Sequence, residues 1–358
     1  MKDLILLNVL SIYFNRGVSR LSNRSLSNNS LSNRSLSNNS VSNSSVSNSR
    51  LNLLSSLLLF IVGFSSVHAT EYSLPQGKAR LIGKELYHTV VKGDYFQQIA
   101  EDYNVGFLAL MAANPNADPF LPAVNSQVTI PKAMLIPPVK RVGILINLAE
   151  LRLYYFSPNE NTVHVFPVGI GRQGLSTPVA TSYISEKRKD PQWRPTKDMK
   201  TRYFVEHGKQ LADVIPAGPD NPFGKYALRL GTSEYLIHGS NKRFGIGMRA
   251  SSGCIRMYDD DIKWLFDNIP LNTHVRIINE PVKVSYENGQ RRLIEIHQPL
   301  SEKKGSKNTI KLSHAVQRFV GTKRELWRQL LPSLENPKGL VVELIPNVTG
   351  SSNTHKPN

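Results

Sequence analysis

The chain contains a single cysteine, Cys254, and a histidine lies upstream of it at position 238. A thiol attacks a carbonyl group as its thiolate, and a nearby imidazole is the usual base that removes the proton. Leu236 and Ile237 predict a buried strand that ends at His238. The glycine-containing stretch 239–253 allows the chain to fold back, which would bring the sulfur to the imidazole. This pattern predicts Cys254 as a nucleophile and His238 as its general base.

Small residues precede the cysteine in the order Ser251-Ser252-Gly253. Because small residues let the backbone approach a substrate closely, we expect the N–H groups of Gly253 and Cys254 to stabilise an oxyanion. Helical spacing of apolar residues follows Asp259-Asp260-Asp261, which would serve as first-turn acids or as an N-cap. The N-terminus of that helix would favour an anion, so we expect a stabilised Cys254 thiolate.

Two structural interpretations compete with this chemistry. A lone cysteine is commonly a small buried apolar residue, and a lone histidine is commonly structural. A metal site needs three or four convergent ligands, and no second cysteine or paired histidine lies nearby in the sequence, so we expect no metal and no cofactor. An oxidising compartment does not favour idle free thiols, so the exported character inferred below favours chemistry.

The segments His238-Gly239-Ser240 and 251–257, SSGCIRM, resemble the signature of the L,D-transpeptidase family, whose catalytic domain is of the YkuD type. The resemblance covers residues 140–279 and implies Cys254 as nucleophile and His238 as base. Many members carry a second histidine where this chain has Ser252. Together with many short strands, the resemblance implies a mainly β catalytic domain with one helix after Cys254.

Further site residues follow from this resemblance. Arg256 is expected to bind a substrate carboxylate or to orient the loop, and an ion pair with the acids at 259–261 is the structural alternative. Trp193 lies in a rigid aromatic loop that borders the substrate groove in relatives, with simple packing as its alternative. Ser252 and Tyr226 complete the expected substrate-binding residues. The carbonyl group of Gly239 would hold the His238 ring in the correct tautomer.

Residues 87–132 contain HTVVKGD, two helical patterns, NPNAD and VTIP, and this order resembles the LysM domain. That family is a small βααβ module that binds glycans containing N-acetylglucosamine. Asp94 and Gln97 are spaced as a capping box for the first helix. Tyr95 stands where the family usually has Ser or Thr. The alternative is a divergent LysM-like unit that only packs against its neighbour.

The two ends of the chain have other characters. Residues 1–50 are low-complexity and repeat LSNRS-like units, which predicts disorder. Residues 51–69 have the apolar run and small residues of a signal peptide, with an uncleaved N-terminal membrane anchor as the alternative. Residues 280–347 predict a C-terminal appendage with a type I′ hairpin at 287–290 and a helix over 313–331. Residues 348–358 are a tail.

The formal net charge of +17 predicts an anionic partner. No basic stripe interleaved with aromatic residues is present, so we expect no nucleic acid as partner. An exported basic chain fits a cell wall rich in peptide carboxylates or a phospholipid surface, and we expect the protein in the periplasm. With one cysteine, no intrachain disulfide can form.

The family resemblance implies acyl transfer through a Cys254 thioester. The donor would be a peptidoglycan stem tetrapeptide that releases D-Ala. The acceptor would be an amine, either a lysine of an outer-membrane lipoprotein or another diamino-acid residue. Two alternatives stay open at this point: a hydrolase acting as carboxypeptidase or amidase, and a non-catalytic protein that binds peptidoglycan glycan.

Overall fold

A computed structural model describes residues 70–301 and 309–346 of the chain. The repeats and the signal peptide predicted within residues 1–69, and the tail at 348–358, lie outside the described residues. Within the described ranges no helix is both long and apolar enough to cross a membrane.

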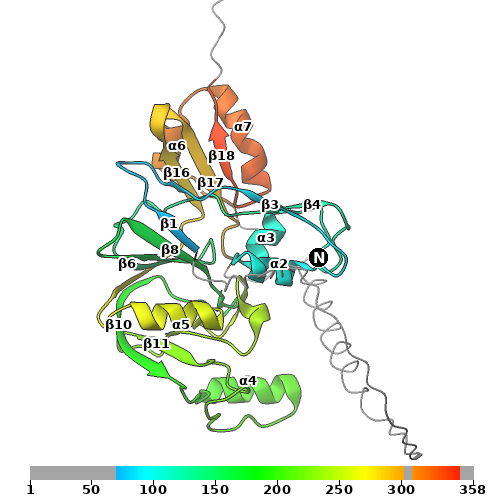
Figure 1. Ribbon diagram of the computed structural model, residues 1–358, viewed down its shortest axis with the longest axis vertical. Helices are drawn as coiled ribbons and strands as arrows, with labels where there is room; N and C mark the ends of the chain where they lie inside the picture. Colours follow the sequence, from blue (N-terminus) through cyan, green and yellow to red (C-terminus); the bar gives the residue numbers. More distant parts are fainter. Residues whose placement is uncertain (1–69, 302–308, 347–358) are drawn as a thin grey trace, which may run out of the picture. The chain divides into compact units, whose positions relative to one another are not determined.

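The LysM-like unit has the predicted βααβ order (Figure 1). Strand β3 (Leu86–Thr89) pairs antiparallel with β4 (Gln127–Ile130), and the helices α2 (Phe96–Asp102) and α3 (Phe107–Ala113) lie between them in the chain. Both helices bury their apolar face in one small core with the strands. Its fully buried members include Ala100, Leu110, Val128 and Ile130.

The predicted capping box at the start of α2 is wrong. Tyr95 occupies the N-cap position, and no side chain caps the helix. The Asp94 carboxylate instead accepts hydrogen bonds from the Val91 N–H and from Nε2 of His88, each at 2.8 Å. The bond from His88 connects the turn before α2 to β3. The spacing of Asp94 and Gln97 in the sequence does not reveal that His88 competes for this carboxylate.

Most of the catalytic domain is organised on a nine-stranded sheet. Its order is β1-β8-β7-β6-β15-β10-β11-β12-β14. The strands are β1 (Thr70–Ser73), β6 (Gly143–Asn147), β7 (Arg152–Phe156), β8 (Thr162–Pro167), β10 (Ala180–Lys189), β11 (Tyr226–Leu230), β12 (Leu236–His238), β14 (Ile255–Arg256) and β15 (His274–Ile278). Pairing is antiparallel except for β6 with β15 and β12 with β14. The domain is mainly β, as predicted.

Two helices belong to this domain, although only one was predicted. The expected helix is α5 (Asp259–Asn268), with the three acids in its first turn and with Ile262 and Leu265 buried in the core. The second, α4 (Lys197–His207), buries none of its residues. It therefore lacks the apolar stripe by which helices are recognised in a sequence. Its ends carry other signals, because the Thr196 hydroxyl caps it and Gly208, with φ 65°, ends it.

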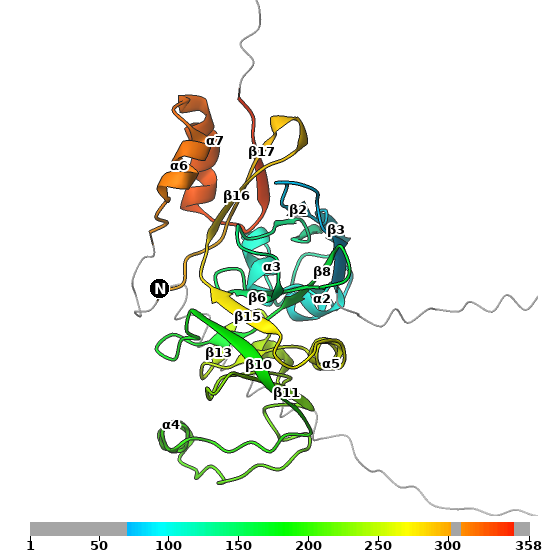
Figure 2. The ribbon, with the colours of Figure 1, turned by 90° about the vertical axis from the view of Figure 1, so that its left-hand side faces the viewer.

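The C-terminal part is a separate three-stranded sheet of β16 (Val282–Tyr286), β17 (Arg292–Ile296) and β18 (Val341–Leu344). The hairpin loop differs from the type I′ turn predicted at 287–290, whose central pair would be residues 288 and 289. The positive φ values lie one residue later, at Gly289 (73°) and Gln290 (63°), within the short 3₁₀ helix η2 (Asn288–Gln290). The single helix predicted over 313–331 is two helices, α6 (His314–Val320) and α7 (Arg324–Glu335). Gly321 breaks the run with φ 79°. Figure 2 shows both helices together on one side of this sheet.

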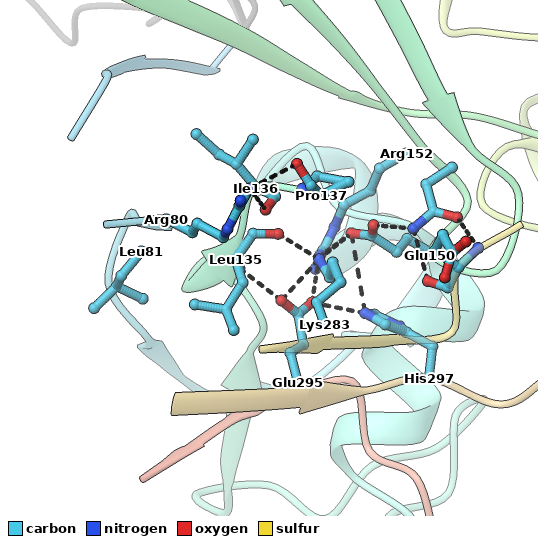
Figure 3. A network of polar contacts seen from close by, with 12 residues as sticks. Arg80, Leu81, Leu135, Ile136, Pro137, Glu150, Arg152, Lys283, Glu295 and His297 are labelled. Atoms are coloured by element: carbon cyan, nitrogen blue, oxygen red, sulfur yellow. Dashed lines mark hydrogen bonds and ion pairs between the residues drawn. The ribbon is translucent and has the colours of Figure 1, made fainter. Parts of the chain in front are cut away.

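A buried group of charged side chains joins the C-terminal sheet to the catalytic domain (Figure 3). Lys283 on β16 is fully buried, and its Nζ lies 2.7 Å from Glu150 Oε2 and 2.8 Å from Glu295 Oε2. Nη1 of Arg152 contacts the same two carboxylates at 3.1 and 2.9 Å. Burial is the largest single influence and would raise the pKa of both carboxyl groups, but Lys283, His297 and Arg152 together outweigh it and hold each pKa below its usual range. Two cations thus balance two carboxylates away from water.

A second buried polar contact joins the LysM-like unit to α5. Nδ2 of Asn104 donates to Asp261 Oδ1 at 3.3 Å. Asn104 Oδ1 and Asp261 Oδ2 are buried without a hydrogen-bond partner in the described part of the chain. Burial raises the pKa of Asp261 to about 8, so the folded protein holds this carboxyl group protonated at neutral pH.

Asp261→Asn should therefore stabilise the protein at neutral and alkaline pH. The folded-state pKa lies above the ordinary value of 3.8, so the folded protein binds more protons and its stability falls as pH rises from about 4 to about 8. We expect a gain of about 2–4 kcal/mol in the free energy of unfolding at pH 8, vanishing near pH 4. Denaturant unfolding at several pH values measures it. The control is Asp260→Asn at the exposed neighbouring residue. It should change the free energy of unfolding by less than about 0.5 kcal/mol.

Candidate active site

The two residues predicted to react lie at the ends of neighbouring parallel strands, where His238 is the last residue of β12 and Cys254 comes just before β14. Ile237 on β12 pairs with Ile255 on β14, and His238 pairs with Arg256. The two isoleucines are fully buried in the core. Because side chains alternate along a strand, His238 and Arg256 point the other way, and Cys254 directly precedes β14 on their side. All three line one cavity of about 370 Å³.

The His238 ring is fixed by its neighbour. Its Nδ1 lies 2.6 Å from the carbonyl oxygen of Gly239. A carbonyl oxygen only accepts hydrogen bonds, so Nδ1 carries the proton and Nε2 is the unprotonated base. Burial and the adjacent Arg256 lower the pKa of His238 to about 3, although the Gly239 contact opposes them. The imidazole is therefore neutral at physiological pH, which is the form a general base needs.

The expected stabilised thiolate is not what the structure shows. Burial raises the pKa of the Cys254 thiol, and the Leu236 backbone and Arg256 offset this only in part. The expectation relied on the N-terminus of α5, but residues 255–258 separate that helix from Cys254 in the chain, and the effect of a helix end fades within one turn. The resting pair is a thiol, whose sulfur lies 3.9 Å from the Glu234 carbonyl oxygen, and a neutral imidazole that lines the same cavity. The proton therefore has to move during the attack itself.

Gly253 also differs from the prediction. Its N–H donates to the Ser251 hydroxyl at 3.1 Å, and its carbonyl accepts from the Thr177 hydroxyl at 2.7 Å. Its φ of 116° suits glycine, and an added Cβ would lie 2.8 Å from the ring of Tyr235. The Gly253 N–H is thus engaged and is no oxyanion donor in this conformation. Of the two predicted donors, the Cys254 N–H stays a prediction, and Gly253 shapes the turn.

The guanidinium of Arg256 lines the cavity. No carboxylate forms an ion pair with it within residues 70–301 and 309–346, and its Nε is buried without a hydrogen-bond partner. The predicted alternative, an ion pair with the acids at 259–261, is therefore not formed. A guanidinium beside the sulfur and the imidazole suits a ligand that carries a carboxylate.

The remaining predicted residues separate into two groups. Ser252 is exposed and lines the cavity, as does Trp193, whose ring lies 6.4 Å from that of Phe223. Phe223 in turn packs on the His238 ring at 4.7 Å. Tyr226 is not part of the cavity as predicted. It is absent from the cavity lining, and its ring packs on Phe266 of α5 at 4.9 Å. The alternation of β11 turns it toward that helix.

One wall of the cavity was not predicted from the sequence. Helix α4 contributes Met199, Arg202, Tyr203 and Glu206 to the lining. Glu206 lies 3.3 Å from Nη2 of Arg172, which connects α4 to the loop after β9 (Ile170–Gly171). Strand β9 pairs with β13 (Arg249–Ser251), so this contact links the wall to the segment that leads into the nucleophile. The residues that begin and end α4, Thr196 and Gly208, were the sequence signal that could have revealed this helix.

A mainly β domain that presents a thiol, a neutral imidazole and a free guanidinium to one cavity defines a cysteine-dependent acyltransferase. The L,D-transpeptidase catalytic domain matches residues 141–284, the L,D-transpeptidase C-terminal domain matches 281–344, and the LysM domain matches 88–131. The chain belongs to the L,D-transpeptidase family.

Two relatives illustrate this relationship, and one solved structure is given beside them as a similarity only. "Probable L,D-transpeptidase YcfS" of Escherichia coli strain K12 is 50% identical over 240 residues, which are 66% of this chain and 75% of that protein. "Probable L,D-transpeptidase ErfK/SrfK" of the same strain is 44% identical over 259 residues, 70% of this chain and 81% of that protein. The NMR structure of the E. faecium L,D-transpeptidase catalytic domain is 19% identical, covers 39% of this chain and 99% of that one, and has a TM-score of 0.30.

Proposed function

We propose that this L,D-transpeptidase transfers an acyl group from a peptidoglycan stem tetrapeptide to an amine in the periplasm. The observation that carries the proposal is the shared cavity of Cys254, His238 and Arg256. The sequence pattern of a signal peptide and the LysM-like unit support a cell-wall location and a glycan partner. The acceptor amine belongs to a lipoprotein lysine or to another diamino-acid residue.

The first step forms a thioester. Nε2 of His238 takes the Cys254 proton while the sulfur attacks the carbonyl carbon at the L-centre of the diamino acid. The Cys254 N–H would donate to the developing oxyanion, a contact typically worth about 3–4 kcal/mol. The amide C–N bond then breaks, and D-Ala leaves with the proton returned by His238. The unpaired Arg256 would hold a stem-peptide carboxylate during this step.

The second step releases the enzyme. The acceptor amine attacks the thioester carbonyl and gives its proton to His238, a new C–N bond forms, and the C–S bond breaks. The departing thiolate regains the proton from the imidazole. Water in place of the amine would give hydrolysis, so the acceptor decides between transpeptidase and carboxypeptidase. Muropeptide masses from a deletion strain would separate these products, since lost lipoprotein-linked species or lost diamino-acid cross-links name the acceptor.

A covalent adduct tests the nucleophile. A carbapenem should add its mass to the wild-type protein through a thioester, and Cys254→Ala should give no adduct although it folds. Intact-protein mass spectrometry measures both, and Ser252→Ala is the matched control because it changes an exposed residue of the same turn. Ser252→Ala should still form the adduct. A folded wild-type protein that forms none would favour a non-catalytic protein that binds the cell wall.

A further inference from the structure

The LysM-like unit contacts the loop that connects the base to the nucleophile. The turn of this loop consists of the short 3₁₀ helix η1 (Arg243–Gly245) and the residues up to Met248. The Leu108 N–H donates to the Gly247 carbonyl at 3.1 Å. Gly106 lies so close that an added Cβ would meet the Gly247 Cα at 3.1 Å. The backbones of α3 and of this turn therefore touch directly.

Side chains cross this contact in both directions. Leu108 of α3 packs against the core of the catalytic domain, and Met248 of the turn packs against the core of the LysM-like unit. Nη1 of Arg243 lies 2.9 Å from Glu101 Oε1. A module joined only by a flexible linker would not exchange side chains in this way, so the contact is a built interface.

The opposite side of the same turn faces the active site. An added Cβ at Gly245 would lie 3.0 Å from Nη1 of Arg256, the cation of the cavity. The loop also supplies Ser240, Lys242 and Ser251 to the cavity lining. The turn is thus packed between the LysM-like unit and Arg256, and a displacement on one side would be transmitted to the other.

We propose that the LysM-like unit is a positioning element of the active site, which holds the turn at 243–248 and through it the guanidinium and the nucleophile loop. This role is independent of glycan binding and rests on the proposed acyl transfer. It follows that the unit should control the acylation rate even for a small ligand without any glycan. If the LysM-like unit served only to recruit the cell wall, such a ligand would react at the same rate whatever happened to the interface.

The test adds a side chain to the LysM-like unit at the interface and changes no residue of the catalytic domain. Gly106 is the N-cap of α3 with φ −74°, a conformation that valine accepts, so Gly106→Val adds a side chain against the turn with little local strain. The matched control is Tyr95→Val, which places valine at the exposed N-cap of α2 in the same unit. Gly106→Ala adds a smaller wedge, and Leu108→Ala removes the crossing side chain instead.

The readout is carbapenem acylation of the full chain, with the saturating rate constant and the half-saturating concentration measured separately. We expect Gly106→Val to lower the saturating rate constant by about tenfold to hundredfold. Gly106→Ala and Leu108→Ala should give smaller losses, and Tyr95→Val none. Hydrogen exchange of the 241–250 amides should rise in Gly106→Val, which shows that the wedge reaches the loop.

Two results would overturn the positioning role. One is unchanged acylation in Gly106→Val together with faster exchange in the loop. The other is an equal loss in Tyr95→Val, which would indicate a general effect of disturbing the LysM-like unit. If Gly106→Val does not fold, Leu108→Ala decides in the same assay. Failure of the proposed function is distinguishable, because then the wild-type protein itself would form no adduct.

Discussion

His238→Gln should lower the rate of carbapenem acylation by about 10²–10⁴-fold while the protein stays folded. The Gly239 carbonyl fixes the proton on Nδ1, so Nε2 is the available base, and glutamine cannot replace it. Because burial raises the pKa of the Cys254 thiol, the enzyme cannot compensate with a ready thiolate. Stopped-flow or mass-resolved acylation kinetics measure the loss.

The same electrostatics set the pH dependence of the wild-type enzyme. Since burial and Arg256 lower the pKa of His238 to about 3, the base stays neutral as the pH falls through the ordinary histidine value of 6.5. We expect no inflection of the acylation rate there, and no ultraviolet thiolate absorbance in the free enzyme at pH 7. A strong thiolate band at neutral pH would contradict the thiol–imidazole ground state.

The chain offers a matched control for the base. His164 is also buried, and burial likewise lowers its pKa, but it packs on Trp264 at 4.2 Å and does not line the cavity. His164→Gln should therefore leave the acylation rate of the folded protein unchanged. An equal loss in both variants would mean that His238 acts through the fold and not as a base.

The sequence reveals the strand that ends at His238 because its apolar residues are consecutive and local. It also reveals α5, whose Ile262 and Leu265 repeat at helical spacing toward the core. Helix α4 escapes this reasoning because none of its residues is buried, so its hydropathy carries no period. It nevertheless forms a wall of the cavity. The periodicity of apolar residues therefore predicts only part of the site.

Other predictions are wrong because a side chain or N–H group has a different partner in the folded protein, either a nearby competing group or a residue far away in the sequence. The Gly253 N–H is an oxyanion donor in a motif, but the Ser251 hydroxyl takes it once the turn is folded. Asp94 has the spacing of a cap, but His88 on the neighbouring strand attracts its carboxylate. Glu150 at a strand turn and Lys283 on a distant hairpin show no pairing in the sequence, because only the tertiary fold brings them together.

That buried pairing leads to the largest expected effect on stability. Lys283→Met should lower the free energy of unfolding by about 3–5 kcal/mol. Methionine keeps most of the volume but leaves Glu150 and Glu295 with Arg152 as their single permanent cation, and it removes the donor that binds the Leu135 carbonyl at 2.6 Å. Chemical denaturation measures the loss. In the exposed pair of Lys263 with Asp267, Lys263→Met should cost less than about 1 kcal/mol.

The charge balance predicts a partial rescue. Lys283→Met combined with Glu150→Gln removes one cation and one anion, which leaves Arg152 facing Glu295 at 2.9 Å, with Nε2 of His297 also 2.6 Å from that carboxylate. The double variant should therefore be more stable than Lys283→Met alone, with a coupling energy of about 2–3 kcal/mol in a double-mutant cycle. Strict additivity would mean that Lys283 matters for packing only. A clear coupling would mean that charge neutrality in a dry interface holds the C-terminal sheet to the catalytic domain.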